Sequence, residues 1–264
     1  MADVSRPPFP PAGQRALLRG AAVPLALLLT WAALAHSGLV NSHLLVPVER
    51  VALVPFTDTH GRNLWPGLAA SLARMMGGFA IGAAAGLLLG LAMGLSRTVE
   101  RLFGPTVHTV RQIALYAWIP LLTAWFGNGE TAKVVFIALS AFFPVVLNTQ
   151  EGLSSVPDQY REVARVLTLP RGRLVRRVLL PGALPSIFIG VQLGLIYAWL
   201  ATVGAEYAMG LGRGVGTLLS EGREHFRMDI VIVGVLTLAL VGFAINAAFG
   251  RVFARALRWR APAR

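Results

Sequence analysis

Three ionisable side chains lie within long apolar stretches of the sequence: Arg74, Arg111 and Glu206. Placing a charged side chain in hydrocarbon costs at least ~2.5–3.5 kcal/mol, so such a residue usually faces the protein interior, a partner charge or water. Two interpretations therefore stay open for each of the three. The residue either joins helices through an ion pair or lines a polar route through the protein.

Aromatic side chains close to these charges extend the set of residues that could line such a route. Tyr116 and Trp118 follow Arg111, and Tyr197 precedes Glu206. The alternative for each aromatic residue is packing, or a place in an aromatic belt at the membrane interface. The candidate pathway residues are thus Arg74, Arg111, Tyr116, Trp118, Tyr197 and Glu206.

The patterns that covalent, metal or nucleotide chemistry requires are absent from the sequence. It has no cysteine, and its five histidines show neither H-x-x-H nor H-E-x-x-H spacing. The single lysine, Lys133, follows Ala132 rather than glycine, so there is no Walker A loop for ATP. The glycines at 210–216 do not fit G-x-G-x-x-G and are interpreted as a flexible loop. We expect no catalytic residue, no metal site and no cofactor in this chain.

The elements that must position these residues are membrane-spanning helices. Of the 264 residues, 55% are hydrophobic and only 14% are charged, and the mean hydropathy is +0.64. Soluble domains carry about 25% charged residues. A spanning helix needs ~20 mostly apolar residues, and this window predicts an all-α, polytopic protein with six spans. They are Ala21–Val40, Trp65–Leu95, Pro105–Phe126, Thr131–Thr149, Leu184–Met209 and Ile230–Ala254, the third interrupted by Pro120.

The distribution of arginine predicts the orientation of these spans. Sixteen arginines against five carboxylates fall before the first span, after the second, after the fourth and after the sixth. The segments at the opposite ends of the spans carry balanced charge. Lys and Arg near span ends stay on the cytoplasmic side, which predicts a multi-pass inner-membrane protein with both termini cytoplasmic. Nucleic-acid binding is not expected, because the arginines lie only in gaps between apolar blocks.

The two ends of the chain are expected to be cytoplasmic tails, residues 1–20 and the basic residues 255–264, with 21–40 as the first spanning helix. Ala33-Leu34-Ala35 also fits an A-x-A signal-peptidase site. Because the apolar run continues to Val40, the length of a full span, an uncleaved helix is favoured.

Glycine recurs at every fourth position of the second predicted span. Spacing by four places these residues on one side of a helix, where another helix backbone can approach closely. Helix packing is the favoured interpretation, and a lining for a pathway is the alternative. The residues are Gly78, Gly82, Gly86, Gly90 and Gly94.

The basic loop 158–181 contains an apolar stripe. Tyr160, Val163, Ala164 and Leu167 recur at i, i+3, i+4 and i+7, which predicts a short amphipathic helix. Such a stripe lies either on lipid headgroups or against another protein chain.

This loop resembles the EAA motif of the membrane subunits of ABC importers. The Glu corresponds to Glu162, the Ala pair to Val163-Ala164 and the final Leu-Pro to Leu180-Pro181, while Thr168 stands where the motif has glycine. Further segments are similar to the permeases for aliphatic sulfonates, taurine and nitrate, over roughly residues 67–259. They are Ile119-Pro120-Leu121-Leu122, Ala124-Trp125-Phe126-Gly127, Phe143-Pro144, Asn148-Thr149, Leu180 to Ser186 and Ala205-Glu206.

The resemblance implies a MetI-like type I fold with a permease domain at 65–254 and coupling helices in 158–181. It implies a homodimer, two separate ATPase chains that bind ATP and Mg, and an extracytoplasmic binding protein that delivers a small anionic solute. The residues that it assigns to contact with the ATPase are Tyr160, Glu162, Val163, Ala164, Arg165, Leu167, Thr168, Leu180 and Pro181. A secondary transporter without an ATPase is the alternative, for which Glu206 would be the candidate acid.

Overall fold

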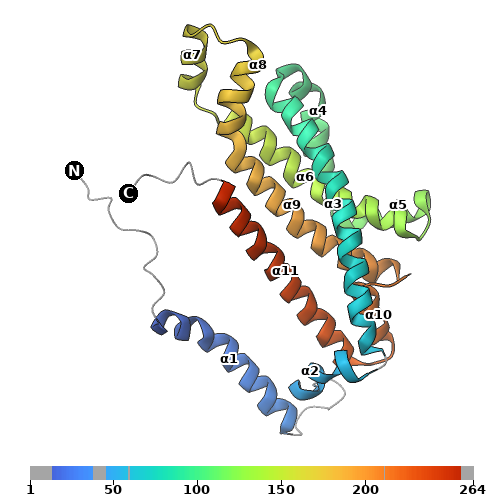
Figure 1. Cartoon of the computed structure of the whole chain (residues 1–264). Helices are drawn as coiled ribbons and strands as arrows, with labels where there is room; N and C mark the ends of the chain where they lie inside the picture. The colour runs from blue at the N-terminus through green and yellow to red at the C-terminus, as the bar shows by residue number, and fades with distance from the viewer. Residues whose placement is uncertain (1–13, 38–45, 59, 211, 257–264) are drawn as a thin grey trace.

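A computed structural model describes residues 14–37, 46–58, 60–210 and 212–256, and these residues are almost entirely helical (Figure 1). Most of the two expected cytoplasmic tails lies outside the described residues. The helices are α1 Gln14–His36, α2 Val48–Thr57, η1 Gly61–Asn63, α3 Leu64–Leu95, α4 Arg97–Val110, η2 Leu115–Trp118, α5 Ile119–Phe126, α6 Glu130–Ser154, α7 Asp158–Val166, α8 Arg171–Leu174, η3 Val175–Leu179, α9 Leu180–Met209, α10 Val215–Glu224 and α11 Met228–Ala256.

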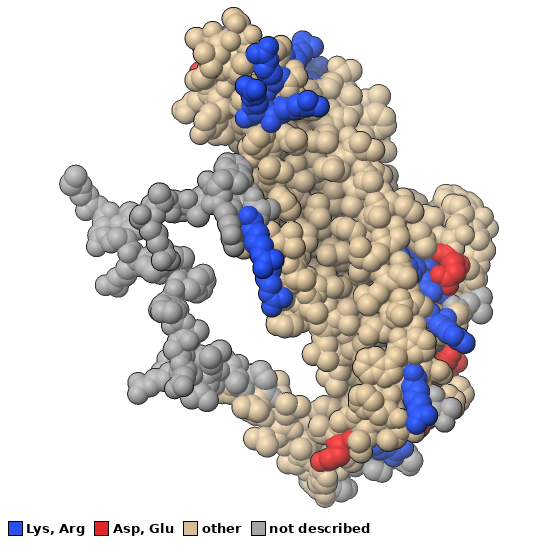
Figure 2. Space-filling model, in the orientation of Figure 1, with Lys and Arg blue, Asp and Glu red and all other residues tan. Residues whose placement is uncertain are grey.

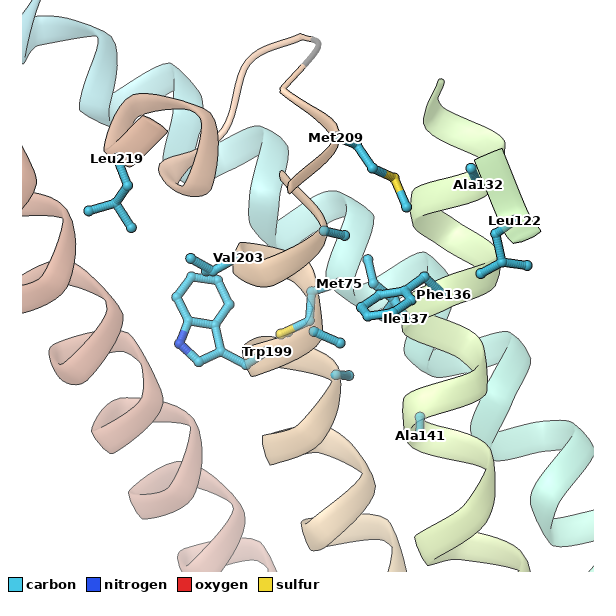
Figure 3. Packing of buried hydrophobic residues seen from close by; sticks show 13 residues of the cluster. Met75, Leu122, Ala132, Phe136, Ile137, Ala141, Trp199, Val203, Met209 and Leu219 are labelled. Carbon is cyan, nitrogen blue, oxygen red and sulfur yellow. The ribbon is translucent and has the colours of Figure 1, made fainter. Parts of the chain in front are cut away.

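The core of the molecule lies where α3, α6 and α9 pack together. Figure 3 shows part of this core: Phe136 and Ile137 of α6 lie on one side of α9, and the Trp199 ring of α9 points to the other side, toward α11, with Met75 of α3 between them in this view. Trp199 is 2% exposed, and its ring N–H donates to the carbonyl of Leu238 in α11 at 3.0 Å. A buried indole thus satisfies its donor and connects α11 to the core.

The glycine stripe of α3 lies in the contact with α6. A Cβ at Gly86 would come 2.8 Å from the Phe142 carbonyl oxygen, and one at Gly90 would come 2.6 Å from that of Val146. A Cβ at Gly82 would overlap the carbonyl oxygen of Ala138. The absence of side chains therefore allows backbone-to-backbone contact along most of α3.

Four helical stretches are long and apolar enough to cross a membrane, within the part of the chain that the structure describes: Gly61–Leu95, Glu130–Ser154, Arg171–Met209 and Met228–Arg255. Leu25–His36 and Leu115–Phe126 are apolar but shorter. The third predicted span, 105–126, is interrupted, but the interruption lies before Leu115 and not at Pro120. Helix α4 ends at Val110, and residues 111–114 separate it from η2 and α5.

Pro120 does not cause this interruption. It stands at the start of α5, where its missing N–H costs no hydrogen bond, and Ile119 before it is helical, with φ −55° and ψ −52°. The polar Arg111 and Gln112, both exposed, lie at the break itself.

The fifth span begins earlier than predicted. Helix α8 continues through one π-helical turn, η3, into α9, so that one helical stretch runs from Arg171 to Met209. Pro181 follows this turn, and a proline ring collides with the carbonyl four residues before it in a regular α-helix. A π turn supplies the extra residue that relieves such a collision.

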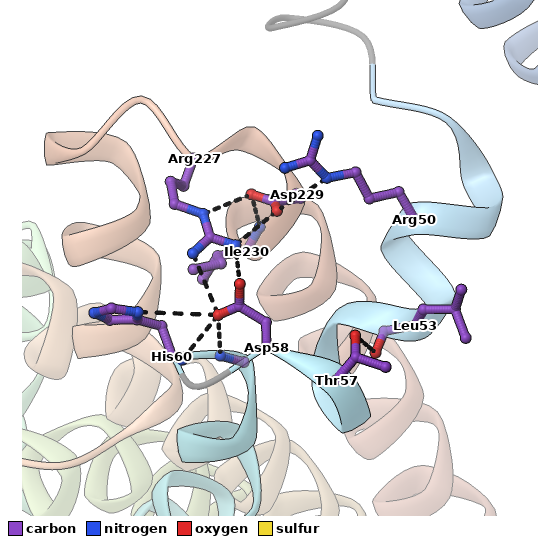
Figure 4. Close-up of polar contacts among 9 residues, drawn as sticks. Arg50, Leu53, Thr57, Asp58, His60, Arg227, Asp229 and Ile230 are labelled. Carbon is purple, nitrogen blue, oxygen red and sulfur yellow. Dashed lines mark hydrogen bonds and ion pairs between the residues drawn. The ribbon is translucent and has the colours of Figure 1, made fainter.

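A polar cluster of Asp58, Arg227 and Asp229 lies at the end of the molecule opposite α7 (Figures 1 and 4). Arg227, between α10 and α11, donates to Asp58 at 2.8 Å and to Asp229 at 2.8 Å. The hydrogen bond from Arg227 lowers the pKa of Asp58 to about 2, and Asp229 and Asp58 raise the pKa of Arg227. Through these hydrogen bonds the cluster joins the segment after α2 to the α10–α11 corner, the loop between these two helices.

Candidate functional site

Helix α7 stands at the end of the molecule where basic side chains gather, while most acidic side chains in that view lie at the other end (Figure 2). Its apolar residues Tyr160, Val163, Val166 and Leu167 are 56–82% exposed. Arg161 donates to the Leu153 carbonyl at 2.9 Å and so fixes α7 to the end of α6. The exposed apolar face is therefore held in a defined position and is free for a partner.

The turn that ends α7 is a Schellman motif centred on Thr168. The Leu169 N–H donates to the Ala164 carbonyl at 3.0 Å, and the Thr168 N–H donates to that of Arg165 at 2.9 Å. Thr168 has a φ of 48°, in the left-handed region that glycine usually occupies at this position. The turn thus keeps the glycine geometry of the EAA motif with a β-branched residue, which carries strain.

Ala164 faces into this chain rather than outward. It is 4% exposed, although Tyr160 and Leu167 on neighbouring turns are 59% and 63% exposed. The expectation that Ala164 belongs to the outward-facing stripe is therefore corrected: the outward apolar face consists of Tyr160, Val163, Val166 and Leu167. The single-face helix predicted from the spacing is therefore split between an exposed apolar face and the buried Ala164.

Arg74 and Glu206, two of the three charges singled out in the sequence, meet inside the molecule. Arg74 of α3 forms an ion pair with Glu206 of α9, whose side chain is 0% exposed. The Glu206 carboxylate also accepts from Ser71 at 2.7 Å and from the Gly216 N–H at 2.9 Å. Each buried charge has its partner, as the cost of burial requires.

Glu130 and Lys133 complete this charged cluster. Glu130 of α6 accepts two hydrogen bonds from Arg74, at 2.6 and 2.9 Å, while its own side chain is 62% exposed. The Lys133 amine lies 3.8 Å from Glu130 and is 1% exposed. Two positive and two negative side chains from three helices balance one another, so the geometry matches an ion-pair lock between α3, α6 and α9.

The prediction of a flexible glycine loop after α9 is wrong for its last part. The Glu206 carboxyl group lies where a Cβ at Gly214 would stand, and the N–H groups of Val215 and Gly216 donate to Ser71 and Glu206. Glycine is required here because the loop backbone passes directly over the carboxylate.

The remaining pathway candidates separate in space. Tyr116 and Tyr197 line one cavity of about 590 Å³ beside the C-terminal half of α9. Trp118 packs against the core, and Arg111 is exposed at the end of α4, away from the other charges. The structure thus places Arg74 with Glu206 and Tyr116 with Tyr197, and it joins neither Arg111 nor Trp118 to them.

Sequence reasoning missed Ser71, Glu130, Lys133 and the Arg227 cluster. Ser71 and Arg74 are three residues apart, as are Glu130 and Lys133, so each pair lies on one helix face. Lys133 is the single lysine of the chain, and it falls inside an apolar run. The three-residue spacing within each pair, and the single lysine inside an apolar run, are the features of the sequence that point to this charged cluster.

Residues 82–258 match the family described as "Binding-protein-dependent transport system inner membrane component". The chain belongs to this family. It is therefore a multi-pass permease subunit of an ABC importer, and its ATPase is a separate subunit. The similarity to such permeases in the loop 158–181 and beyond is confirmed at the level of the family.

Curated relatives of this permease cover most of its length. The putative aliphatic sulfonates transport permease protein SsuC of Escherichia coli is 37% identical over 83% of this chain and 83% of its own. The taurine transport system permease protein TauC of the same species is 33% identical over 89% of this chain and 87% of its own. The nitrate import permease protein NrtB of Synechocystis is 31% identical, over 87% and 86%.

Solved structures with the same fold come from ABC importers. A chain of the methionine ABC transporter MetNI in an inward-facing conformation aligns with a TM-score of 0.66 and 21% identity. The alignment covers 76% of this permease and 99% of that chain. The all-α, MetI-like type I fold expected from the sequence is confirmed.

Proposed function

We propose that this permease works as a homodimer that carries a small anionic solute inward, with two ATPase subunits seated on its α7 helices. An extracytoplasmic binding protein delivers the solute. ATP and Mg are bound by the ATPase subunits, not by this chain. The names of the relatives, which import aliphatic sulfonates, taurine, nitrate or bicarbonate, support an anionic substrate.

The observation that carries the coupling role is the exposed apolar face of α7. Tyr160, Val163, Val166 and Leu167 stand on a helix that is too short to cross a membrane and too apolar to be left in water. The polar residues Glu162 and Arg165 flank this face and would form the rim of the contact. Leu180 and Pro181 begin α9 and anchor the coupling loop to the span.

The secondary-transporter alternative receives little support from Glu206. A proton relay requires a carboxylate that can release its partners, whereas Glu206 is held by Arg74, Ser71 and the Gly216 N–H. The cluster therefore supports a role in joining helices.

The test is a Val163→Asp permease, co-expressed with its ATPase. Burial of an unpaired carboxylate at the contact should reduce the co-purified ATPase at least tenfold and abolish uptake. Val163→Thr, which keeps the shape of the side chain without a charge, is the matched control. Val163 is 56% exposed, so the permease itself should still insert and dimerise. Full ATPase retention and normal uptake in Val163→Asp would contradict the coupling role of α7.

Orientation is tested separately with reporter fusions. Fusions after Arg101 and Arg177 should report the cytoplasm, and fusions near Asp58 and Arg223 should report the outside. A cytoplasmic signal at Asp58 would contradict the proposed topology.

A further inference from the structure

The break in the third predicted span, residues 111–114, lies level with the middle of α6. On the α4 side of the break, Val107 belongs to an apolar cluster with Val146 of α6. On the η2 side, the centroid of the Tyr116 ring lies 5.8 Å from that of Phe136, also in α6. Because α6 is itself long and apolar enough to cross a membrane, and both contacts lie well inside it, the break stands near the middle of the bilayer.

The described residues leave this break open. Arg111, Gln112, Ile113 and Ala114 are all exposed. The carbonyl groups of the first three accept none of the backbone hydrogen bonds that the described residues form. Lipid cannot supply such bonds, and non-helical backbone at membrane depth is tolerated only inside protein or beside a water-filled cavity. The break therefore faces water or a second protein surface, and not hydrocarbon.

The charge of Arg111 decides between these two surroundings. Its side chain is exposed, and none of the described acidic side chains forms an ion pair with it. A second copy packed tightly over the break would bury an unpaired guanidinium, which is strongly unfavourable. A water-filled space beside residues 111–114 avoids this cost.

Such a space would adjoin an opening that the permease already has. Leu115 and Tyr116, which follow the break directly, line the cavity of about 590 Å³ beside the C-terminal half of α9. Interrupted helices near the bilayer midplane line solute sites in many transporters. The break thus has the depth, the exposure and the neighbouring cavity that a segment of an import route requires.

We propose that residues 111–114 line the water-filled import route of this permease at mid-membrane, and that Arg111 makes this route selective for anions. A fixed positive charge in a water-filled space raises the local concentration of anions and lowers that of cations. The inference rests on the proposed function, because it assigns residues to the route of that importer. It goes beyond the proposed function by naming the residue that selects the charge of the solute.

The experiment measures the access of water to single introduced cysteines, since the chain has no cysteine of its own. Inverted membrane vesicles hold the complex of permease and ATPase, so that reagents and nucleotide reach the side of the α7 helices. Gln112→Cys and Ile113→Cys should react with membrane-impermeant methanethiosulfonate reagents, as measured on the permease by mass spectrometry. Phe243→Cys is the matched control and should react at least tenfold more slowly, because Phe243 is 73% exposed near the middle of the apolar span α11.

A non-hydrolysable ATP analogue with Mg tests whether the labelled space belongs to the import route. A route that opens to one side of the membrane at a time should close toward the α7 side when the ATPase binds nucleotide. Labelling of Gln112→Cys and Ile113→Cys should therefore slow at least fivefold, whereas a permanent crevice would keep its rate.

Arg111→Gln separates the charge from the access of water. The anionic sulfonatoethyl reagent and the cationic trimethylammonium-ethyl reagent are compared at Gln112→Cys, each relative to its rate with free cysteine. A positive charge a few ångströms away attracts one reagent and repels the other, so the ratio of the anionic to the cationic rate should fall at least fivefold in Arg111→Gln. Arg111→Lys should keep the ratio, and Arg213→Gln, an exposed arginine before α10, should not change it.

Three results would overturn the inference. Absence of labelling at both Gln112→Cys and Ile113→Cys would place the break against a second copy or lipid. Labelling that does not respond to nucleotide would assign the break to a crevice outside the route, and an unchanged reagent ratio in Arg111→Gln would remove the selecting role of Arg111. Failure of the proposed function is recognised independently, because the ATPase would then not co-purify with the wild-type permease.

Discussion

Thr168 is the residue whose backbone conformation is least suited to its side chain. A β-branched residue at a φ of 48° costs on the order of 1–3 kcal/mol, and it persists here because two hydrogen bonds close the turn around it. Thr168 replaces the glycine that the EAA motif has at this position. The structure nevertheless retains the turn and places the cost of the positive φ on Thr168.

Thr168→Gly should therefore stabilise the turn after α7 by about 1 kcal/mol, since glycine adopts a positive φ without steric cost. The measurement is hydrogen exchange of the Leu169 amide, which donates to the Ala164 carbonyl and should exchange about fivefold more slowly. Thr168→Ala keeps a Cβ and is the control, with little change expected. Faster exchange in Thr168→Gly would show that the threonine side chain holds the turn.

The two acidic partners of Arg74 differ in burial, and this difference predicts unequal effects. The Glu206 side chain is 0% exposed and that of Glu130 is 62% exposed. Glu206→Gln should cost about 3–5 kcal/mol of stability, because it leaves a buried guanidinium without one of its charges. Glu130→Gln should cost about 0–1 kcal/mol, because water screens this pair. The melting temperatures of the two variants are compared in the same detergent. Equal losses of stability would contradict the ion-pair lock between α3, α6 and α9.

Residue identity alone located part of this charged cluster. Arg74 and Glu206 could be found because a charge in an apolar block needs a partner. Glu130 and Lys133 could not be joined to them from the sequence, since they stand near a span end where water could solvate them. Only the packing of α3 beside α6 brings Glu130 to Arg74.

The contact between α3 and α6 depends on which side of α3 lacks side chains. Gly82 faces α6, where a Cβ would overlap the Ala138 carbonyl oxygen, while Gly77 has nothing within 4 Å of its Cβ position. The same substitution at these two positions should therefore have opposite effects.

Gly82→Ala should lower the stability of the permease, because the Cβ can be accommodated only if two helix backbones move apart. Gly77→Ala should leave stability unchanged or raise it by about 0.5–1 kcal/mol, because alanine is the better helix former. The check is the melting temperature of each purified variant together with its membrane yield. Gly86→Leu, also directed at α6, should reduce yield without changing substrate preference.

The spans show why periodicity and hydropathy give only part of an architecture. Long apolar runs located α3, α6, α9 and α11, since length and composition suffice for them. The third predicted span was interrupted at the wrong place, at Pro120 instead of 111–114, because a window average does not register the break there. The helix of the fifth span begins before the predicted Leu184, because a π turn carries it through Pro181.

The Arg227 cluster connects the segment after α2 with the α10–α11 corner, parts of the chain far apart in sequence. Hydrogen bonding from Arg227 lowers the pKa of Asp58 from 3.8 to about 2. A depressed carboxyl pKa contributes stability that is fully present above the unfolded value and is lost as pH falls through the folded value.

Stability should therefore not change through this group between pH 5 and 8, and it should fall between about pH 4 and pH 2. The measurement is the melting temperature of the wild type and of Asp58→Asn across this range. Asp58→Asn should be less stable at pH 7 and should lose part of the acid-dependent decline. Identical pH profiles for the two proteins would mean that the pair with Arg227 contributes nothing to folding.

The continuous helical stretch from Arg171 to Met209 has 39 residues, and at 1.5 Å per residue it is about 58 Å long. One end adjoins the turn after α7, and the other carries Glu206 and the lining of the cavity. A stiff rod of this length acts as a lever, in which a tilt of about 5° displaces one end by about 5 Å relative to the other. A small angular displacement at the α7 end would thus shift the Glu206 end by about the rise of one helical turn.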